Sequence, residues 1–328
     1  MVPESIPPVL TPKTVRPGYR SQAADTNVDA DIYLFARLRQ LALKQRIEIA
    51  IAHNRGVRKL CLAGIKSRHR GASLEEIRLQ FARAVLSEKF PPGFQPQGGE
   101  SFAGVGFRSQ SRAGVPPVEG TGVPSKLKNS ETDETIWIQD SISLAGELHQ
   151  ILESVNIPYY VSRGVASSIH GEPRSTRDLD LVIEIQRDQI NLLVTTLEAA
   201  GYYCPEKGAV EDLQQGRDRM LNITHTETIA NADLYVTDTS AFAASQMARR
   251  RLLDVEGMPN FWLISPEDLL LQKLVWGRGS QSQKQWRDVL GILKLQADFL
   301  DYGYLTEWAE NLGLVDLISQ AFTEAGIL

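Results

Sequence analysis

The 328-residue sequence predicts an α+β protein with a small mixed β-sheet, a C-terminal helical lobe and a small all-α N-terminal domain. Short runs of alternating apolar residues occur between residues 159 and 236, interspersed with helical patterns. After residue 265 only helical patterns remain. A separate helical pattern precedes a long stretch rich in Pro, Gly and Ser. These three observations favour a mixed sheet and a helical lobe in one domain, with helices added in front.

Composition excludes several classes of protein. The chain is 42% hydrophobic and 23% charged, as expected for a globular protein with a sizeable core. Cys61 and Cys204 are far apart in sequence, so neither a disulfide framework nor a zinc site is indicated. No apolar run approaches the roughly 18 residues of a spanning helix, and prolines interrupt the N-terminus where a signal peptide needs an apolar core. We expect a cytoplasmic protein without a membrane segment.

The chain divides into four parts by composition and periodicity. We expect a disordered tail over 1–29, a basic helical accessory domain over 30–90, a linker over 91–134, and the main domain over 135–328, with its core at 155–260 and its helical lobe at 265–328.

The accessory domain is expected to contain three helices. The first runs from Asp31 to about His53, where Asn54-Arg55-Gly56 is predicted to break it, and the second covers Val57–Ser67. A capping box, Ser73-Leu74-Glu75-Glu76, opens the third helix, which continues to about Lys89. Residues 30–90 hold 13 Lys and Arg against 5 Asp and Glu. This charge is compatible with nucleic-acid binding, with a solvated helical face, or with docking onto the acidic main domain.

Two aspartates project from one face of an apolar strand predicted over 178–185. The period-2 rule sends Asp178 and Asp180 to one face and Leu179 and Leu181 to the other. Asp233 has the same relation to its neighbours in a strand over 232–236. If the two strands are neighbours, the three carboxylates form a cluster suited to Mg²⁺ or Mn²⁺. By itself, Asp-x-Asp is short and common, and more often marks a solvated strand edge than a metal site.

Gly164 lies between a strand over 159–161 and a short helix that continues to about His170. A glycine there permits close approach to the backbone, and the N–H groups of a helix N-terminus attract phosphate. Carboxylate-held metal beside a phosphate cradle indicates phosphoryl or nucleotidyl transfer.

The segment Gly164-Val165-Ala166 to His170-Gly171-Glu172-Pro173-Arg174-Ser175-Thr176-Arg177-Asp178-Leu179-Asp180 resembles the signature of the minimal nucleotidyltransferases of the DNA polymerase β superfamily. It is similar, more narrowly, to the group that includes the AbiEii-type toxins. The resemblance covers about residues 155–295 and implies a nucleotidyltransferase core. It also implies that Asp178 and Asp180 bind metal, that Gly164 is the second small residue of the phosphate turn, and that Asp233 is the third carboxylate, closest to a general base.

Further positions follow from the same resemblance. Arg174 and Thr176 match the family's turn, where Arg174 either touches phosphate or bonds local carbonyls. Lys273, in Pro266-Glu267-Asp268-Leu269-Leu270-Leu271-Gln272-Lys273, matches a helical motif whose lysine faces the nucleotide phosphates, although an ion pair with a nearby acid explains it equally well. Arg163 departs from the pattern, since the family has a glycine there. Its guanidinium either contacts the triphosphate or blocks the approach of phosphate to the backbone.

The sequence therefore predicts an Mg²⁺- or Mn²⁺-dependent enzyme that transfers an NMP from an NTP to an acceptor hydroxyl. The acceptor is RNA, such as a tRNA end, or protein, and the resemblance adds the possibility of a toxin in a toxin–antitoxin or phage-defence system with an antitoxin partner. An alternative is a catalytically impaired nucleotide-binding or partner-binding module of the same fold.

Overall fold

The computed structural model describes residues 16–91, 94–96, 137–205, 207–280 and 282–328. Most of the predicted linker and the first half of the predicted tail lie outside these residues. The second half of the tail packs against the C-terminal lobe. The Arg20 N–H donates to the Glu324 carbonyl at 2.9 Å, and Gln22 Nε2 donates to the Arg287 carbonyl at 2.6 Å. The prediction of disorder is therefore wrong for this half of the tail.

The described strands form one mixed seven-stranded sheet in the order β3-β4-β5-β2-β1-β7-β6. Strands β1 and β7 are parallel, as are β2 and β5, and the other neighbouring pairs are antiparallel. The α+β prediction is confirmed, but β6 and β7 were not predicted because three residues are too few to show a period. The strands are β1 (Tyr159–Ser162), β2 (Leu179–Ile183), β3 (Tyr202–Tyr203), β4 (Met220–His225), β5 (Asn231–Val236), β6 (Arg251–Leu253) and β7 (Phe261–Leu263).

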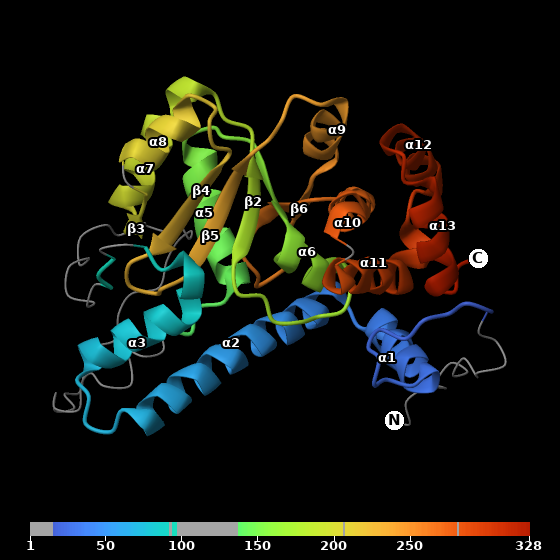
Figure 1. Ribbon diagram of the computed structural model, residues 1–328, viewed down its shortest axis with the longest axis horizontal. Helices are drawn as coiled ribbons and strands as arrows, with labels where there is room; N and C mark the ends of the chain where they lie inside the picture. The colour runs from blue at the N-terminus through green and yellow to red at the C-terminus, as the bar shows by residue number, and fades with distance from the viewer. Residues whose placement is uncertain (1–15, 92–93, 97–136, 206, 281) are drawn as a thin grey trace, which may run out of the picture.

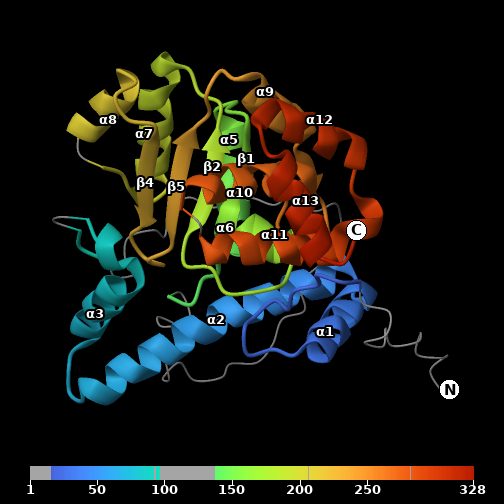
Figure 2. The same ribbon diagram turned by 45° about the vertical axis from the view of Figure 1, so that its right-hand side comes forward.

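Helices surround the sheet and form the C-terminal lobe (Figures 1 and 2). Helix α6 packs on β1, β2, α10 and α11. Helix α12 packs on α10, and helix α13 packs on α11. The described helices are α1 (Val28–Gln40), α2 (Leu43–Arg68), α3 (Leu74–Leu86), the 3₁₀ turn η2 (Ser87–Lys89), α5 (Ser141–Ser154), α6 (Arg163–His170), η3 (Arg187–Gln189), α7 (Ile190–Ala199), α8 (Lys207–Gln214), α9 (Ala241–Arg249), α10 (Pro266–Ser280), α11 (Gln283–Gln296), η4 (Ala297–Phe299), α12 (Tyr302–Leu312) and α13 (Val315–Glu324).

The predicted helix break at Asn54-Arg55-Gly56 is wrong. Helix α2 is continuous through these residues, and the chain breaks earlier, at Leu41 and Ala42. Asn54 is tolerated because its Nδ2 donates to the Ala50 carbonyl one turn back at 3.1 Å. Gly56 costs only about 1 kcal/mol relative to alanine in a helix interior. Long, continuous α2 runs beneath the sheet in both views and contacts α5 and α6 (Figures 1 and 2).

Helix α1 is attached to the C-terminal lobe by a buried ion pair. Lys294 Nζ on α11 donates to Asp31 Oδ2 at 2.6 Å, and the two side chains are 1% and 0% exposed. Asp31 also accepts from the Tyr19 hydroxyl at 2.5 Å and from the Gln22 N–H at 2.8 Å. Three segments of the chain, residues 19–22, α1 and α11, therefore depend on one carboxylate, because a buried charge is tolerated only when its partners are in place.

We expect Asp31→Asn and Lys294→Met each to lower the free energy of unfolding by about 3–5 kcal/mol, because each leaves a buried charge unpaired. Urea denaturation measures the change. Exposed Glu48 on α2 supplies the control, since Glu48→Gln should change stability by less than about 0.5 kcal/mol. Losses no larger than that of the control would contradict the importance of this pair.

Candidate functional site

Three aspartates come together where β2 lies beside β5. The two strands are parallel, and their register pairs Asp180 directly with Asp233. Asp178 immediately precedes β2. Across the other edge of β5, Asn222 pairs with Asp233, and its Nδ2 donates to Asp233 Oδ1 at 2.6 Å. The alternation of β2 and β5 therefore produces the carboxylate cluster expected from the sequence.

A lysine from the N-terminal helices lies between two of these carboxylates. Lys89 Nζ donates to Asp178 Oδ2 at 2.7 Å and to Asp233 Oδ2 at 2.6 Å. Burial alone would lower the pKa of Lys89, but the hydrogen bonds and opposite charges of Asp178 and Asp233 outweigh it and raise the pKa. The ammonium therefore stays charged and neutralises part of the acidic cluster.

Asp180 has a different environment from the other two aspartates. Burial raises the pKa of its carboxyl to about 6, although the Arg163 guanidinium, 3.7 Å away, acts in the opposite direction. The Tyr235 hydroxyl is 3.3 Å from Asp233 Oδ2, and burial raises its pKa to about 12. Tyr235 therefore stays protonated at neutral pH and donates a hydrogen bond to Asp233.

Arg163, the departure from the family pattern, is the first residue of α6. Its φ of 49° lies in the left-handed region, which a glycine adopts without strain. The guanidinium carbon lies 3.9 Å from the ring centroid of Tyr235 and 4.4 Å from that of Trp276, and Nη1 donates to the Tyr235 hydroxyl at 2.9 Å. The backbone thus keeps a glycine-like conformation, while the side chain is held by two aromatic rings.

Gly164 lies close to the turn that precedes β2. A Cβ at this position would be 3.0 Å from Thr176 Cγ2, so a larger residue would push on the turn. The turn is fixed from below by α2, since the Thr176 N–H donates to Asn54 Oδ1 at 2.8 Å. Thr176 Oγ1 is buried and has no hydrogen-bond partner among the described residues. Buried hydroxyls normally have a partner, so this one is available to a ligand.

Arg174 and Lys273 share one carboxylate, that of Asp288. Arg174 donates to it from Nε at 3.1 Å and from Nη2 at 2.9 Å, and Lys273 Nζ donates at 2.7 Å. Burial would raise the pKa of Asp288, but the two cations outweigh it and lower the pKa, whereas burial lowers that of Lys273. Of the two interpretations of Lys273, the structure therefore contains the ion pair, which holds α10, α11 and the turn together.

All eight predicted site residues line one cavity of about 450 Å³. They are Arg163, Gly164, Arg174, Thr176, Asp178, Asp180, Asp233 and Lys273. The sequence analysis missed Lys89, Asn222 and Tyr235. Tyr235 was detectable, because it lies two residues after Asp233 on the same face of a strand. Lys89 was not, because nothing in the sequence pattern brings the N-terminal helices to this cavity.

The carboxylates fit a divalent cation in their chemistry. Asp178 and Asp233 already converge on one cation, the Lys89 ammonium, and carboxylate oxygens are the ligands that Mg²⁺ and Mn²⁺ prefer. Among the described residues, no group of three or more His, Cys, Asp or Glu side chains is arranged to hold a metal ion. The Lys89 ammonium lies where a cation shared by Asp178 and Asp233 would lie. A metal at this place therefore requires Lys89 to move.

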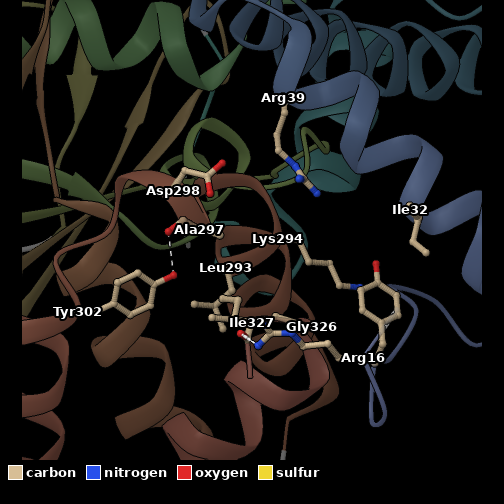
Figure 3. Close-up of a pocket in the computed structure, with 12 residues that line it drawn as sticks. Arg16, Ile32, Arg39, Leu293, Lys294, Ala297, Asp298, Tyr302, Gly326 and Ile327 are labelled. Carbon is tan, nitrogen blue, oxygen red and sulfur yellow. Dashed lines mark hydrogen bonds between the residues drawn. The ribbon is translucent and has the colours of Figure 1, made fainter. Parts of the chain in front are cut away.

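A second cavity, of about 490 Å³, lies between α1 and the C-terminal helices (Figure 3). Arg39 and Lys294 extend toward it from opposite sides, together with Arg16. Lys294 is neutralised there by Asp31, and none of the eight predicted site residues lines this cavity. We therefore attribute it to the packing of α1, and the chemistry to the carboxylate cavity.

No family model matches the sequence, and no curated protein matches it either. Among solved structures, the chain is similar to an antigenic nucleotidyltransferase-like protein from Paracoccidioides brasiliensis, with 20% identity and a TM-score of 0.38 over 56% of this chain and 93% of that one. It is also similar to ANT(2")-Ia in complex with adenylyl-2"-tobramycin, with 14% identity and a TM-score of 0.34 over 52% of this chain and 93% of that one. At these TM-scores the likeness carries no weight for function, which has to come from the site.

Along the described residues, no helix is both long and apolar enough to span a bilayer.

We expect Asp288→Asn to lower the free energy of unfolding by about 3 kcal/mol, because it leaves Lys273 buried without a counter-charge. Adding Lys273→Met should restore part of this loss, since the double variant no longer buries an unpaired ammonium. Denaturant titration of both variants measures the difference. Lys284→Gln, at an exposed residue of the same cavity, is the control. If the double variant is no more stable than Asp288→Asn, the ion pair is not the reason for the loss.

Proposed function

We propose that this protein is a metal-dependent nucleotidyltransferase that moves an NMP from an NTP to an acceptor hydroxyl. One observation carries the proposal: three aspartates, a glycine at a strand-to-helix turn, and several Lys and Arg residues line the same cavity. A cavity with carboxylates alone could bind any of many cations, and a cavity with Lys and Arg alone could bind any of many anions. Both in one cavity suit a nucleoside triphosphate with its divalent ion.

Asp178, Asp180 and Asp233 would hold Mg²⁺ or Mn²⁺, which, when bound, neutralises charge on the triphosphate. Gly164 admits phosphate oxygens close to the backbone N–H groups of α6, and the Thr176 hydroxyl supplies a donor that is otherwise unused. Arg163, Arg174 and Lys273 line the same cavity and would add positive charge around the phosphates, while Arg174 and Lys273 keep their pairing with Asp288. Asp233 is assigned as the general base, which accepts the proton of the acceptor hydroxyl. The acceptor oxygen bonds to the α-phosphorus as the bond to pyrophosphate breaks.

RNA, such as a tRNA end, is the acceptor that the charge of the N-terminal helices favours, and a protein hydroxyl is the other candidate. Part of this positive charge is used inside the protein. Arg55 pairs with Asp140 at 2.8 Å, and Arg58 donates to the carbonyls of Trp137 and Ile229. Arg68 and Arg70, at the far end of α2, are exposed. They form the basic surface that supports RNA. We place the reaction in the cytoplasm, where NTP and RNA are both abundant.

A second function is favoured by the two cationic side chains that contact the aspartates. Lys89 and Arg163 contact all three aspartates. If these ion pairs never open, the aspartates cannot hold a metal ion. The protein would then bind a nucleotide or a partner without transferring NMP, as a catalytically impaired module of the same fold.

Transfer of label tests the first function against the second. The full chain is incubated with each α-labelled NTP, Mg²⁺ and total RNA or cell lysate. We expect label on one class of acceptor, and a loss of at least about 100-fold in Asp178→Ala/Asp180→Ala, because the charge stabilisation of the reacting phosphate is removed. Exposed Glu184, just after β2, provides a matched carboxylate control, and Glu184→Gln should transfer normally. Nucleotide binding without transfer to any acceptor would favour the impaired module.

A toxin in a toxin–antitoxin or phage-defence system is a further part of the proposal, with a separate antitoxin as its partner. Induced expression of the wild-type chain should then arrest growth, because a transferase that modifies RNA or protein stops translation or another essential step. Asp178→Ala/Asp180→Ala should relieve the arrest at equal protein levels. Arrest that persists in the double variant would show that it does not depend on the carboxylates.

A further inference from the structure

Lys89 reaches the carboxylates from outside the sheet. It is the last residue of the 3₁₀ turn η2, which follows α3, whereas the three aspartates belong to β2, β5 and the turn before β2. Its side chain is 32% exposed, and its Nζ lies within 2.7 Å of both Asp178 and Asp233. The residue therefore forms part of the cavity wall, and a movement of η2 would withdraw its ammonium without changing the sheet.

The backbone that carries Lys89 is strained. Ser87, two residues earlier, has a φ of 53° and a ψ of −119°, a conformation that residues other than glycine rarely adopt. Such conformations cost about 1–3 kcal/mol each and persist only where the surroundings enforce them. The two hydrogen bonds of Lys89 lie two residues from this strained position. We infer that they help to enforce it and that their loss would favour a relaxed backbone.

Aromatic residues after Lys89 attach this segment to the edge of the sheet. The rings of Phe90 and Phe94 are 5.8 Å apart, and that of Phe94 is 5.6 Å from Tyr203 on β3. Phe94 is buried, while Phe90 is half-buried. The segment is thus held by an apolar contact at one point and by an ionic contact at another.

We propose that Ser87–Phe90, together with Phe94, forms an autoinhibitory plug whose Lys89 ammonium occupies the place of a divalent cation between Asp178 and Asp233. The plug and a metal ion exclude each other, because both need the same two carboxylate oxygens and their positive charges repel at short range. The active form is then the one in which η2 has moved away. The inference rests on the proposed function only for the choice of divalent ion.

The plug is distinguished from a structural ion pair by its thermodynamic linkage to metal. A ligand that binds only the open form shows an apparent association constant equal to its intrinsic one multiplied by the fraction of molecules that are open. Removal of Lys89 would therefore tighten metal binding. A structural ion pair predicts the reverse, because losing it disorders the aspartates that the metal needs.

Mn²⁺ titration of the full chain, followed by the EPR signal of free Mn²⁺, tests the plug without NTP or acceptor. We expect Lys89→Met to bind Mn²⁺ about 100-fold more tightly than wild type, since two charge-assisted hydrogen bonds no longer oppose the metal. Lys284→Met removes the same charge from the same cavity at an exposed residue, and should tighten binding by no more than about fivefold. Equal affinities of Lys89→Met and wild type, or equal gains in both variants, would overturn the proposal.

A second variant covers the case in which Lys89→Met folds poorly. Phe90→Ala keeps the lysine and removes part of the apolar attachment, so it should also tighten Mn²⁺ binding. In wild type, amide hydrogen exchange at residues 84–90 should accelerate when Mn²⁺ is added, and protection that is unchanged at saturating Mn²⁺ would contradict release of the plug. Tight Mn²⁺ binding by Lys89→Met without any NMP transfer would support the plug and refute the transferase.

Discussion

The site depends above all on the parallel pairing of β2 with β5. In a parallel pair the side chains of paired residues stand on the same face of the sheet, so the register that aligns Leu179 with Ala232 also aligns Asp180 with Asp233. A slip of one residue along β2 would turn Asp178 and Asp180 toward the core face and expose Leu179 and Leu181, both fully buried here. The hydrophobic core therefore specifies the register, and the register specifies the distance between the carboxylates. The acidic cluster is stable because it is attached to the most buried part of the protein.

Half of the candidate site was predictable from local sequence patterns, whereas Arg163, Arg174, Thr176 and Lys273 came from the family resemblance. Asp178, Asp180 and Asp233 follow from period-2 alternation, and Gly164 from its position between a strand and a helix. Each of these signals lies within about eight residues. The failures lie where long-range packing decides. Asn54 was predicted to break a helix. In the structure its side-chain amide donates to the Ala50 carbonyl and accepts a hydrogen bond from the Thr176 N–H. Lys89 looked like an ordinary helix-end lysine, since its partners are 89 and 144 residues away.

Charge in the carboxylate cavity is nearly balanced by the chain itself. Lys89 and Arg163 face the three aspartates, and Arg174 and Lys273 face Asp288. Such internal pairing lowers the cost of keeping four carboxylates in one half-buried place. It also means that an incoming cation has to displace a partner that is already present on the aspartates. Which ligand the cavity binds then depends on which ion pairs open easily. The buried Lys273–Asp288 pair opens less easily than the partly exposed pairs of Lys89.

Helix α2 determines the distance between the turn at Thr176 and the side chain of Lys89. Asn54 in its middle fixes the turn at Thr176, and its C-terminal end leads into α3 and Lys89. An α-helix advances 1.5 Å and turns 100° with each residue. A single insertion between Asn54 and Arg68 would rotate everything that follows by that angle and carry Lys89 away from the aspartates. The number of residues in this half of the helix is therefore not free to change, whereas exposed positions of α2 without a partner or a role in binding are free to vary in residue type. Relatives that share the Lys89 contact are expected to keep this length even where their α2 sequences have diverged.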